Sequence, residues 1–150
     1  MNNNIIEQKI FVSIASYRDN QLPKTVQSLL ENAEYPERLT IGILHQNNLN
    51  EDKDCVYLGG HKNVIQHFVD YQTTLGLSWA RNYIFSHILS DELFSLQIDS
   101  HIRFDKNWDT TLLNMYYSTN DEFAIISHYP TGYDSQTEIK DPKQYTRFIH

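Results

Sequence analysis

Residues 9–16, with the sequence Lys-Ile-Phe-Val-Ser-Ile-Ala-Ser, form a short and nearly continuous apolar run that contains several β-branched residues. Such a run is typical of a strand that is covered on both faces. Turn-prone polar residues follow at 17–20, and a helical stripe of apolar side chains then begins at Leu22, with Pro23 suited to the first turn. A buried strand followed by an amphipathic helix is the first indication of an α/β fold.

The same alternation continues along the chain. Further strands are predicted at 39–46, 63–69, 93–98 and 123–127, and further helices at 77–89 and 110–117. Residues 47–60 are predicted to form a loop. The pattern predicts an α/β fold with a mainly parallel central sheet and right-handed crossovers. Ligands bind such sheets at the carboxyl ends of the strands, so the residues directly after each strand are the first candidates for a site.

Composition limits the classes of function. The chain has 150 residues, 40% of them apolar, which favours one domain with a sizeable core. The formal net charge of −7 argues against nucleic-acid binding, and a single cysteine, Cys55, excludes an internal disulfide framework. No apolar stretch reaches the ~20 residues that span a bilayer. Residues 1–8 lack the features of a signal peptide and are predicted to be poorly ordered, so we expect a soluble, cytoplasmic protein.

The sharpest chemical signal is Asp99-Ser100-His101, directly after a predicted strand. In extended backbone, residues two apart point to the same side, so Asp99 and His101 would be able to bind one divalent cation, with substrate phosphates and water completing its shell. Ser100 would point the opposite way. The alternative is that Asp99 caps the turn and His101 is an ordinary surface residue.

The wider segment strengthens the first interpretation. Residues 99–104, Asp-Ser-His-Ile-Arg-Phe, together with 107–109, Asn-Trp-Asp, resemble the D-S-H-x-R-F…W-D signature of a glycosyltransferase family, the UDP-GlcNAc:polypeptide (hydroxyproline) N-acetylglucosaminyltransferases and their bacterial relatives. Other segments are similar to that family in the same order: Ser-Tyr-Arg-Asp at 16–19, Gly42 with Gln46, Asp54-Cys55, Gly76 with Ala80-Arg81, and residues 127–133. Leu77 stands where the family has proline, and the chain ends at His150, earlier than a complete domain of this type.

The resemblance implies a fold of the GT-A class, a nucleotide-sugar-binding α/β sandwich, here a single, partial domain over residues 1–150 that lacks the acceptor half. It also implies Mn²⁺ or Mg²⁺ as cofactor, a UDP-sugar donor and a protein or glycan acceptor. Asp99 and His101 would be the metal ligands, and with Arg81 the catalytic residues. The donor-binding residues implied are Ser16, Tyr17, Arg18, Asp19, Gln46, Arg81 and Ser100.

Several of these residues have a second interpretation that the sequence leaves open. Arg81 either stabilises a diphosphate or pairs with a nearby acid on a solvated helix face. Asp19 either accepts a hydrogen bond from uracil or ribose or caps a turn. Trp108 is expected to be a packing residue rather than a sugar platform, and Asp109 is expected to cap the helix that follows it.

The resemblance therefore implies a metal-dependent transferase that moves N-acetylglucosamine from UDP-GlcNAc to a hydroxyl group, with retention of configuration. The main alternative is a non-catalytic remnant that binds a nucleotide sugar or a partner and has a tendency to self-associate. Metal-dependent phosphoester hydrolysis is a third alternative, although it normally requires more carboxylates around two metals.

Overall fold

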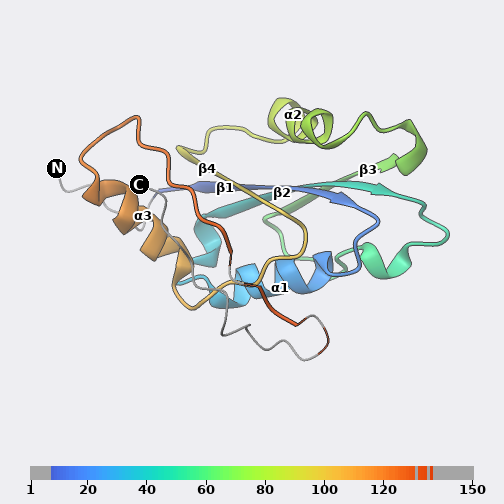
Figure 1. Ribbon diagram of the computed structural model, residues 1–150, viewed down its shortest axis with the longest axis horizontal. Coiled ribbons are helices and arrows are strands. Elements are labelled where there is room, and N and C mark those ends of the chain that lie inside the picture. Colours follow the sequence, from blue (N-terminus) through green and yellow to red (C-terminus); the bar gives the residue numbers. More distant parts are fainter. Residues whose placement is uncertain (1–7, 131, 135, 137–150) are drawn as a thin grey trace. The chain divides into compact units, whose positions relative to one another are not determined.

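The computed structural model in Figure 1 describes residues 8–130, 132–134 and 136. The chain divides into two compact units, the first ending at Thr110 and the second beginning at Thr111. The first unit is built on a parallel four-stranded sheet with the order β3-β2-β1-β4. Its strands are β1 (Ile10–Tyr17), β2 (Leu39–Asn47), β3 (Val64–Asp70) and β4 (Phe94–Ile98). The prediction of a Rossmann-like α/β fold with a parallel sheet is confirmed.

Helices cover both faces of this sheet. Helix α1 (Leu22–Asn32) lies on one face and α2 (Leu77–His87) on the other, as Figure 1 shows. A third helix, α3 (Trp108–Ser118), follows β4. Short 3-10 helices are η2 (Pro36–Arg38), η3 (Lys53–Cys55) and η4 (Tyr71–Thr73). None of the helices in the described ranges is both long and apolar enough to pass through a membrane.

In the first unit, the boundaries predicted for helices and strands agree closely with the observed ones. Pro23 lies in the first turn of α1, as predicted, and α2 begins at Leu77 directly after Gly76. Gly76 has a φ of +92°, a conformation that glycine adopts without the steric penalty other residues incur. The predicted loop at 47–60 contains the short helix η3 and a turn at 49–51, and the prediction of poor order at 1–8 falls almost wholly outside the described residues.

The prediction of a fifth strand at 123–127 is wrong. Residues 124–130 have no regular secondary structure, and the apolar side chains of Phe123 and Ile125 are 82% and 93% exposed. An apolar run becomes a strand only when its backbone groups are paired with a neighbouring strand, and hydropathy alone does not report that pairing.

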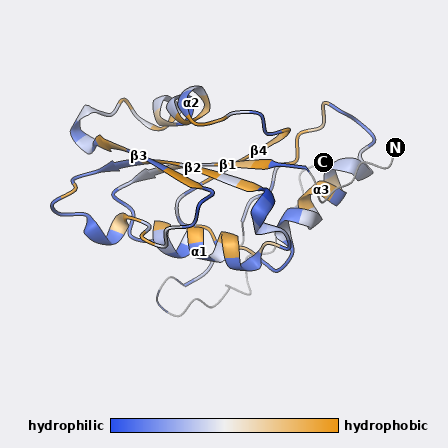
Figure 2. Cartoon of the chain, turned by 180° about the vertical axis from the view of Figure 1, so that it is seen from behind, coloured by the Kyte–Doolittle hydropathy of each residue, from blue (hydrophilic) through white to orange (hydrophobic). Residues whose placement is uncertain are grey.

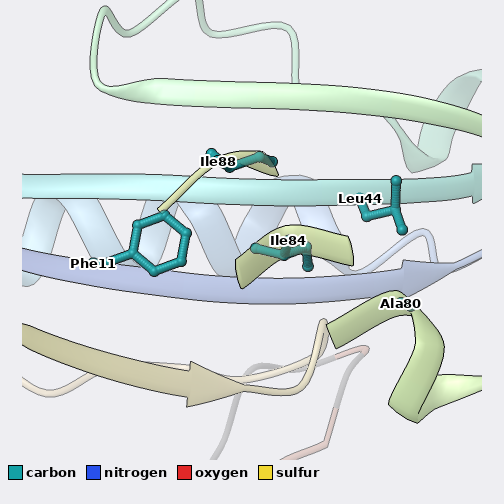
Figure 3. Packing of buried hydrophobic residues seen from close by; sticks show 5 residues of the cluster. All are labelled: Phe11, Leu44, Ala80, Ile84 and Ile88. Carbon is teal, nitrogen blue, oxygen red and sulfur yellow. The ribbon is translucent and has the colours of Figure 1, made fainter. Parts of the chain in front are cut away.

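The core lies on both sides of the two central strands. Figure 2 shows hydrophobic colouring along the strands of the sheet. On the α2 face, Figure 3 shows a fully packed cluster in which side chains of β1 and β2 meet those of the helix. Its buried members are Phe11, Leu44, Ala80, Ile84 and Ile88. The apolar stripe of α1 is equally well covered, since Leu22, Val26 and Leu29 have no exposed surface.

Gly42 is required by packing within this cluster. A Cβ atom at this position would lie 2.6 Å from Phe11 Cζ and 3.1 Å from Ile88 Cγ2. Glycine in the middle of a strand often marks such a close approach. The packing thus gives a physical reason for one residue of the Gly42…Gln46 pattern that does not involve a ligand.

We therefore expect Gly42→Ala to lower the free energy of unfolding by about 1–3 kcal/mol, because the buried ring of Phe11 would have to move. Denaturant unfolding measures the loss. Phe11→Leu in the same chain removes the atoms that clash, so the double variant should be more stable than the sum of the two single losses predicts. Strict additivity of the two changes would contradict this packing explanation.

The first turn of α3 is anchored to the rest of the first unit by Asp109. Its carboxylate has no exposed surface and accepts hydrogen bonds from the backbone N–H groups of Glu34 and Tyr35 at 2.8 and 3.0 Å. Arg38 donates to the same carboxylate from Nε at 3.1 Å and from Nη2 at 2.8 Å. The expectation that Asp109 caps its own helix is wrong, because the side chain binds the segment that connects α1 to η2.

Trp108 is a packing residue, as expected. The side chain is 6% exposed, and its Nε1–H donates to the carbonyl oxygen of Leu29 at 2.9 Å. The ring of Phe104 packs against it at a centroid distance of 4.7 Å. A buried indole that has satisfied its donor is typical of the core.

Candidate functional site

Several of the predicted site residues lie beyond the carboxyl ends of β1 and β4. These two strands pair directly and in parallel, so residues that follow Tyr17 and Ile98 emerge at the same edge of the sheet. Asp19 from the first segment and residues 99–101 from the second are brought together there. The site is therefore positioned by neighbouring central strands rather than by one loop alone.

Asp19, Ser100 and His101 form a hydrogen-bonded group, which we call the Asp19 cluster. Oδ2 of Asp19 accepts from Ser100 Oγ at 2.6 Å and from His101 Nδ1 at 2.8 Å. Its Oδ1 accepts from the backbone N–H of Gln21 at 2.9 Å, which is the geometry of an Asx turn. Asp19 therefore caps the turn, as one of its two interpretations predicted, while its contact with a nucleoside stays a prediction.

The electrostatics of Asp19 reflect this arrangement. Partial burial opposes ionisation and raises the pKa of the carboxyl group. The hydrogen bonds from Ser100, His101 and Gln21 act in the opposite direction and outweigh it, so the pKa of Asp19 lies below its usual value. The cluster is thus built around a carboxylate that is ionised at neutral pH.

Thr25 of α1 fixes the backbone of the loop after β4. Its hydroxyl donates to the carbonyl oxygen of Ser100 at 2.7 Å and accepts from the backbone N–H of Ile102 at 3.0 Å. The side chain has no exposed surface. Because this buried hydroxyl is hydrogen-bonded to the backbone on both sides of His101, it restricts the conformations available to that residue.

Arg81, Asp99 and Gln97 form a second group, the Arg81 cluster. Arg81 Nη2 lies 3.4 Å from Asp99 Oδ1. With its amide oriented so that the oxygen faces the guanidinium, Gln97 accepts from Arg81 Nε at 3.1 Å and Nη1 at 3.2 Å. The side chains of Arg81 and Asp99 are 31% and 56% exposed, so this ion pair lies at the surface.

The geometric argument that paired Asp99 with His101 needs correction. Strand β4 ends at Ile98, so the two-residue alternation of extended backbone does not continue through 99–101. Ser100 does not point away from His101, because both side chains donate to one oxygen of Asp19. Asp99 instead contacts Arg81. In the described part of the chain, no set of three or more His, Cys, Asp or Glu side chains is arranged to hold a metal ion.

Arg18 lies in a separate ion-pair network. Its guanidinium donates to both carboxylate oxygens of Asp52, at 2.8 and 3.0 Å, and to Glu51 at 3.0 Å. It also lies 4.5 Å from the centre of the Tyr71 ring. These contacts connect the end of β1 with the loop after β2 and with η4, and they raise the pKa of Arg18, chiefly through the hydrogen bond to Asp52.

The remaining predicted residues lie at the ends of β1 and β2. Gln46 is 3% exposed and donates from Nε2 to the carbonyl oxygen of Ser16 at 3.4 Å. Ser16 is fully buried, and its hydroxyl has no hydrogen-bond partner in the part of the chain that the structure describes. Tyr17 is 55% exposed and lies edge-on to Tyr71 at 6.3 Å. Among the described residues, no hydrogen bond or ion pair joins the side chains of Ser16, Tyr17 or Gln46 to the Asp19 cluster.

Cys55 is not a reactive thiol in this arrangement. It is 3% exposed, and burial, aided by the nearby carboxylate of Asp54, raises its pKa to about 11. At neutral pH the thiolate that nucleophilic chemistry requires is therefore almost unpopulated.

The family of the chain follows from a comparison with known protein families. The family model described as Glycosyltransferase (GlcNAc) matches residues 9–62 and 58–149. The chain belongs to this glycosyltransferase family. A comparison with curated proteins gave no match. Membership implies a glycosyltransferase-like function with a sugar donor and an acceptor.

Both clusters lie within the matched residues of this glycosyltransferase chain. Of the predicted site residues, the structure brings Asp19, Ser100 and His101 into one hydrogen-bonded group and Arg81 and Asp99 into another. It places Arg18 in ion pairs with acids of the 47–55 loop.

Sequence analysis missed Thr25, Gln97 and Asp52. Thr25 had a detectable signal, because it is a polar residue on the apolar stripe of α1, three residues after Leu22 and four before Leu29. Gln97 and Asp52 had none, since an exposed strand glutamine and a loop aspartate are both common. Their roles depend on which segments the fold brings together.

Proposed function

We propose that this chain is the donor-binding part of a metal-dependent N-acetylglucosaminyltransferase of the GT-A class, which transfers N-acetylglucosamine from UDP-GlcNAc to a hydroxyl of a protein or glycan with retention of configuration. The observation that carries the proposal is that two hydrogen-bonded groups, Arg81 with Asp99 and His101 with Asp19, follow or border the ends of neighbouring parallel strands in a chain of this family. This is the place where such sheets bind ligands.

We propose Asp99 and His101 as the protein ligands of a Mn²⁺ or Mg²⁺ ion bound together with a diphosphate, on the chemistry of their donor atoms. Asp99 offers a largely exposed carboxylate, and His101 offers an imidazole whose Nδ1 is held by a carboxylate. Such a carboxylate–imidazole pair is the usual support of a histidine that binds metal. Two protein ligands are few, so phosphate oxygens and water would complete the shell. When bound, the ion supplies Lewis-acid stabilisation of the departing diphosphate.

Arg81 is proposed to bind the same diphosphate. Its planar guanidinium suits phosphate oxygens, and its present partners, Asp99 and Gln97, hold it at the strand end where the phosphates would lie. Departure of UDP leaves negative charge on the leaving oxygen, and a fixed cation nearby lowers the energy of that state. Retention by front-side attack requires no dedicated protein base.

For the donor nucleoside we propose Ser16, Tyr17, Arg18, Asp19, Gln46 and Ser100 as the surrounding residues. Their positions after β1, β2 and β4 support this assignment. Because Arg18 pairs with Asp52 and Glu51, it would act by fixing the loop that borders the nucleoside. The buried hydroxyl of Ser16, which has no partner among the described residues, has an unused hydrogen-bonding capacity.

We expect UDP and Mn²⁺ together to raise the melting temperature of the chain more than either alone. A ligand that binds only the folded state adds stability as RT ln(1 + [L]/Kd), which is about 2.7 kcal/mol at a hundredfold excess over Kd. Thermal unfolding with UDP, Mn²⁺, both, and both with EDTA measures the effect. The absence of any shift at millimolar UDP and Mn²⁺ would remove the basis for donor binding.

A second candidate is a nucleotide-sugar-binding remnant without turnover. It is favoured by the finding that the described residues contain no group of three or more His, Cys, Asp or Glu side chains that could hold a metal ion, and that Asp99 is paired with Arg81. The two candidates differ in release of UDP from UDP-GlcNAc. Thermal stabilisation without release of UDP, either to water or to added peptide and glycan acceptors, would support the remnant.

A further inference from the structure

The carboxylate of Asp19 accepts more hydrogen bonds than a turn cap requires. An Asx turn uses one carboxylate oxygen, and here Oδ1 performs that role toward Gln21. The other oxygen, Oδ2, accepts two short hydrogen bonds from side chains on the loop after β4, 81 and 82 residues away in sequence. Asp70 at the end of β3 makes the same Asx turn toward Gln72, with Oδ1 accepting at 2.8 Å.

We propose that Asp19 is the positioning residue for His101: it fixes the imidazole as the Nδ1–H tautomer and thereby assigns the metal-binding role to Nε2. This inference rests on the proposed function, in which His101 is a metal ligand. In this role Asp19 does not touch the metal and acts through the orientation of the ring.

The chemistry of the two groups determines the tautomer. An ionised carboxylate only accepts hydrogen bonds, so the 2.8 Å contact requires a proton on Nδ1. In a neutral imidazole the lone pair is then on Nε2, which becomes the atom able to bind a cation. Without such a partner, a side chain that is 59% exposed samples several ring orientations and both tautomers.

The surroundings hold Asp19 itself in place. The hydroxyl of Ser100 and the backbone N–H of Gln21 each bind one carboxylate oxygen, and Thr25 fixes the Ser100 carbonyl. Three segments, the end of β1, helix α1 and the loop after β4, therefore determine one imidazole orientation. A metal ligand oriented in this way needs less ordering when the ion binds.

Asp19→Asn is the direct test. The amide keeps the shape of the side chain, but its NH₂ group can donate to Nδ1 and so favours the opposite tautomer, with the proton on Nε2. We expect Mn²⁺ in the presence of UDP to bind about 10- to 100-fold more weakly, the usual effect of losing such a partner. Electron paramagnetic resonance of free Mn²⁺ gives the affinity. Asp70→Asn, which removes the same charge from the equivalent Asx turn, should leave it unchanged.

A second measurement needs no metal. In ¹⁵N-labelled wild-type chain, the imidazole resonances of His101, assigned with His101→Gln, should report Nδ1–H, and in Asp19→Asn they should report Nε2–H. Ser100→Ala, which keeps the carboxylate, should retain the Nδ1–H tautomer. If Asp19→Asn does not fold, the wild-type and Ser100→Ala tautomers still decide the question.

The outcomes separate this inference from the function on which it rests. A wild-type chain that shows Nδ1–H but binds no Mn²⁺ with UDP overturns the proposed metal chemistry, and with it the ligand role of Nε2, while the orientation of His101 by Asp19 stands. A wild-type chain that binds Mn²⁺ but shows Nε2–H, or an Asp19→Asn chain that binds Mn²⁺ as tightly as wild type, overturns the positioning role alone.

Discussion

Asp109→Ala is expected to lower the free energy of unfolding by about 3–5 kcal/mol, because it leaves the buried guanidinium of Arg38 without its carboxylate. The two side chains are 0% and 2% exposed, so water cannot replace the lost partner. The same change leaves the backbone N–H groups of Glu34 and Tyr35 without an acceptor. A buried charge that loses its carboxylate and buried donors that lose their acceptor both cost free energy, and the two effects act in the same direction.

Urea unfolding followed by circular dichroism measures this loss. Asp91→Ala is the matched control, because Asp91 also pairs with a cation, Lys9 at 3.3 Å, but at 73% exposure. Exposed pairs contribute about 0–1 kcal/mol, so the control should remain close to wild type. A loss in Asp109→Ala no larger than that of the control would mean that the carboxylate is not the anchor of α3.

The same carboxylate gives a pH dependence with a defined sign. Burial raises the pKa of Asp109, but hydrogen bonds from Glu34 and Tyr35 and from Arg38 outweigh it and hold the pKa below its usual value of 3.8. A carboxyl group with a depressed folded-state pKa contributes stability that is complete above its unfolded pKa and is lost as the pH falls through the folded value. Below about pH 4, wild type should therefore lose stability more steeply than Asp109→Ala.

Much of this fold is predictable from the sequence because its strands are central. β1 and β2 are buried on both faces, so their apolar runs are continuous and their ends are marked by polar residues. The predicted ends of these strands differ from the observed ones by a single residue. The apolar stripe of α1 is equally plain, since one face contacts the sheet and the other contacts water.

The site was predictable in its location but not in its internal contacts. Strand order in a parallel sheet brings Asp19 and residues 99–101 to one edge, and that follows from the pattern. Which side chains pair does not follow, because the turn after Ile98 ends the strand alternation and directs Ser100 and His101 to the same carboxylate. The role of Asp109 could not be predicted from the sequence for a similar reason, since its partners are more than 70 residues away along the chain.

Asp99→Asn is expected to remove the Mn²⁺-dependent part of the stabilisation by UDP and, in an active chain, to reduce transfer by about a hundredfold or more. A bound divalent ion contributes several kcal/mol to stabilising a departing diphosphate, and about 2.7 kcal/mol corresponds to a hundredfold in rate. The amide retains the shape of the side chain but is a much weaker ligand for a hard cation.

Stability without ligand distinguishes this effect from misfolding. Asp99 is 56% exposed and its contact with Arg81 is 3.4 Å long, so the unliganded variant should unfold within about 1 kcal/mol of wild type. Asp91→Asn makes the same charge change at the exposed pair with Lys9 and should keep the full Mn²⁺–UDP shift. An Asp99→Asn chain that kept this shift would show that the cation binds elsewhere.

Without a metal ion, Asp99→Asn is expected to have the opposite effect on the binding of UDP. In wild type the negative charge of Asp99 lies beside Arg81 and competes with a phosphate for the guanidinium. Asp99→Asn removes this competitor, so UDP in EDTA should bind the variant at least as tightly as it binds wild type. Weaker metal-free binding in the variant would mean that Asp99 contacts the nucleotide through a hydrogen bond rather than through a shared cation, and would assign Arg81 a partner other than the diphosphate.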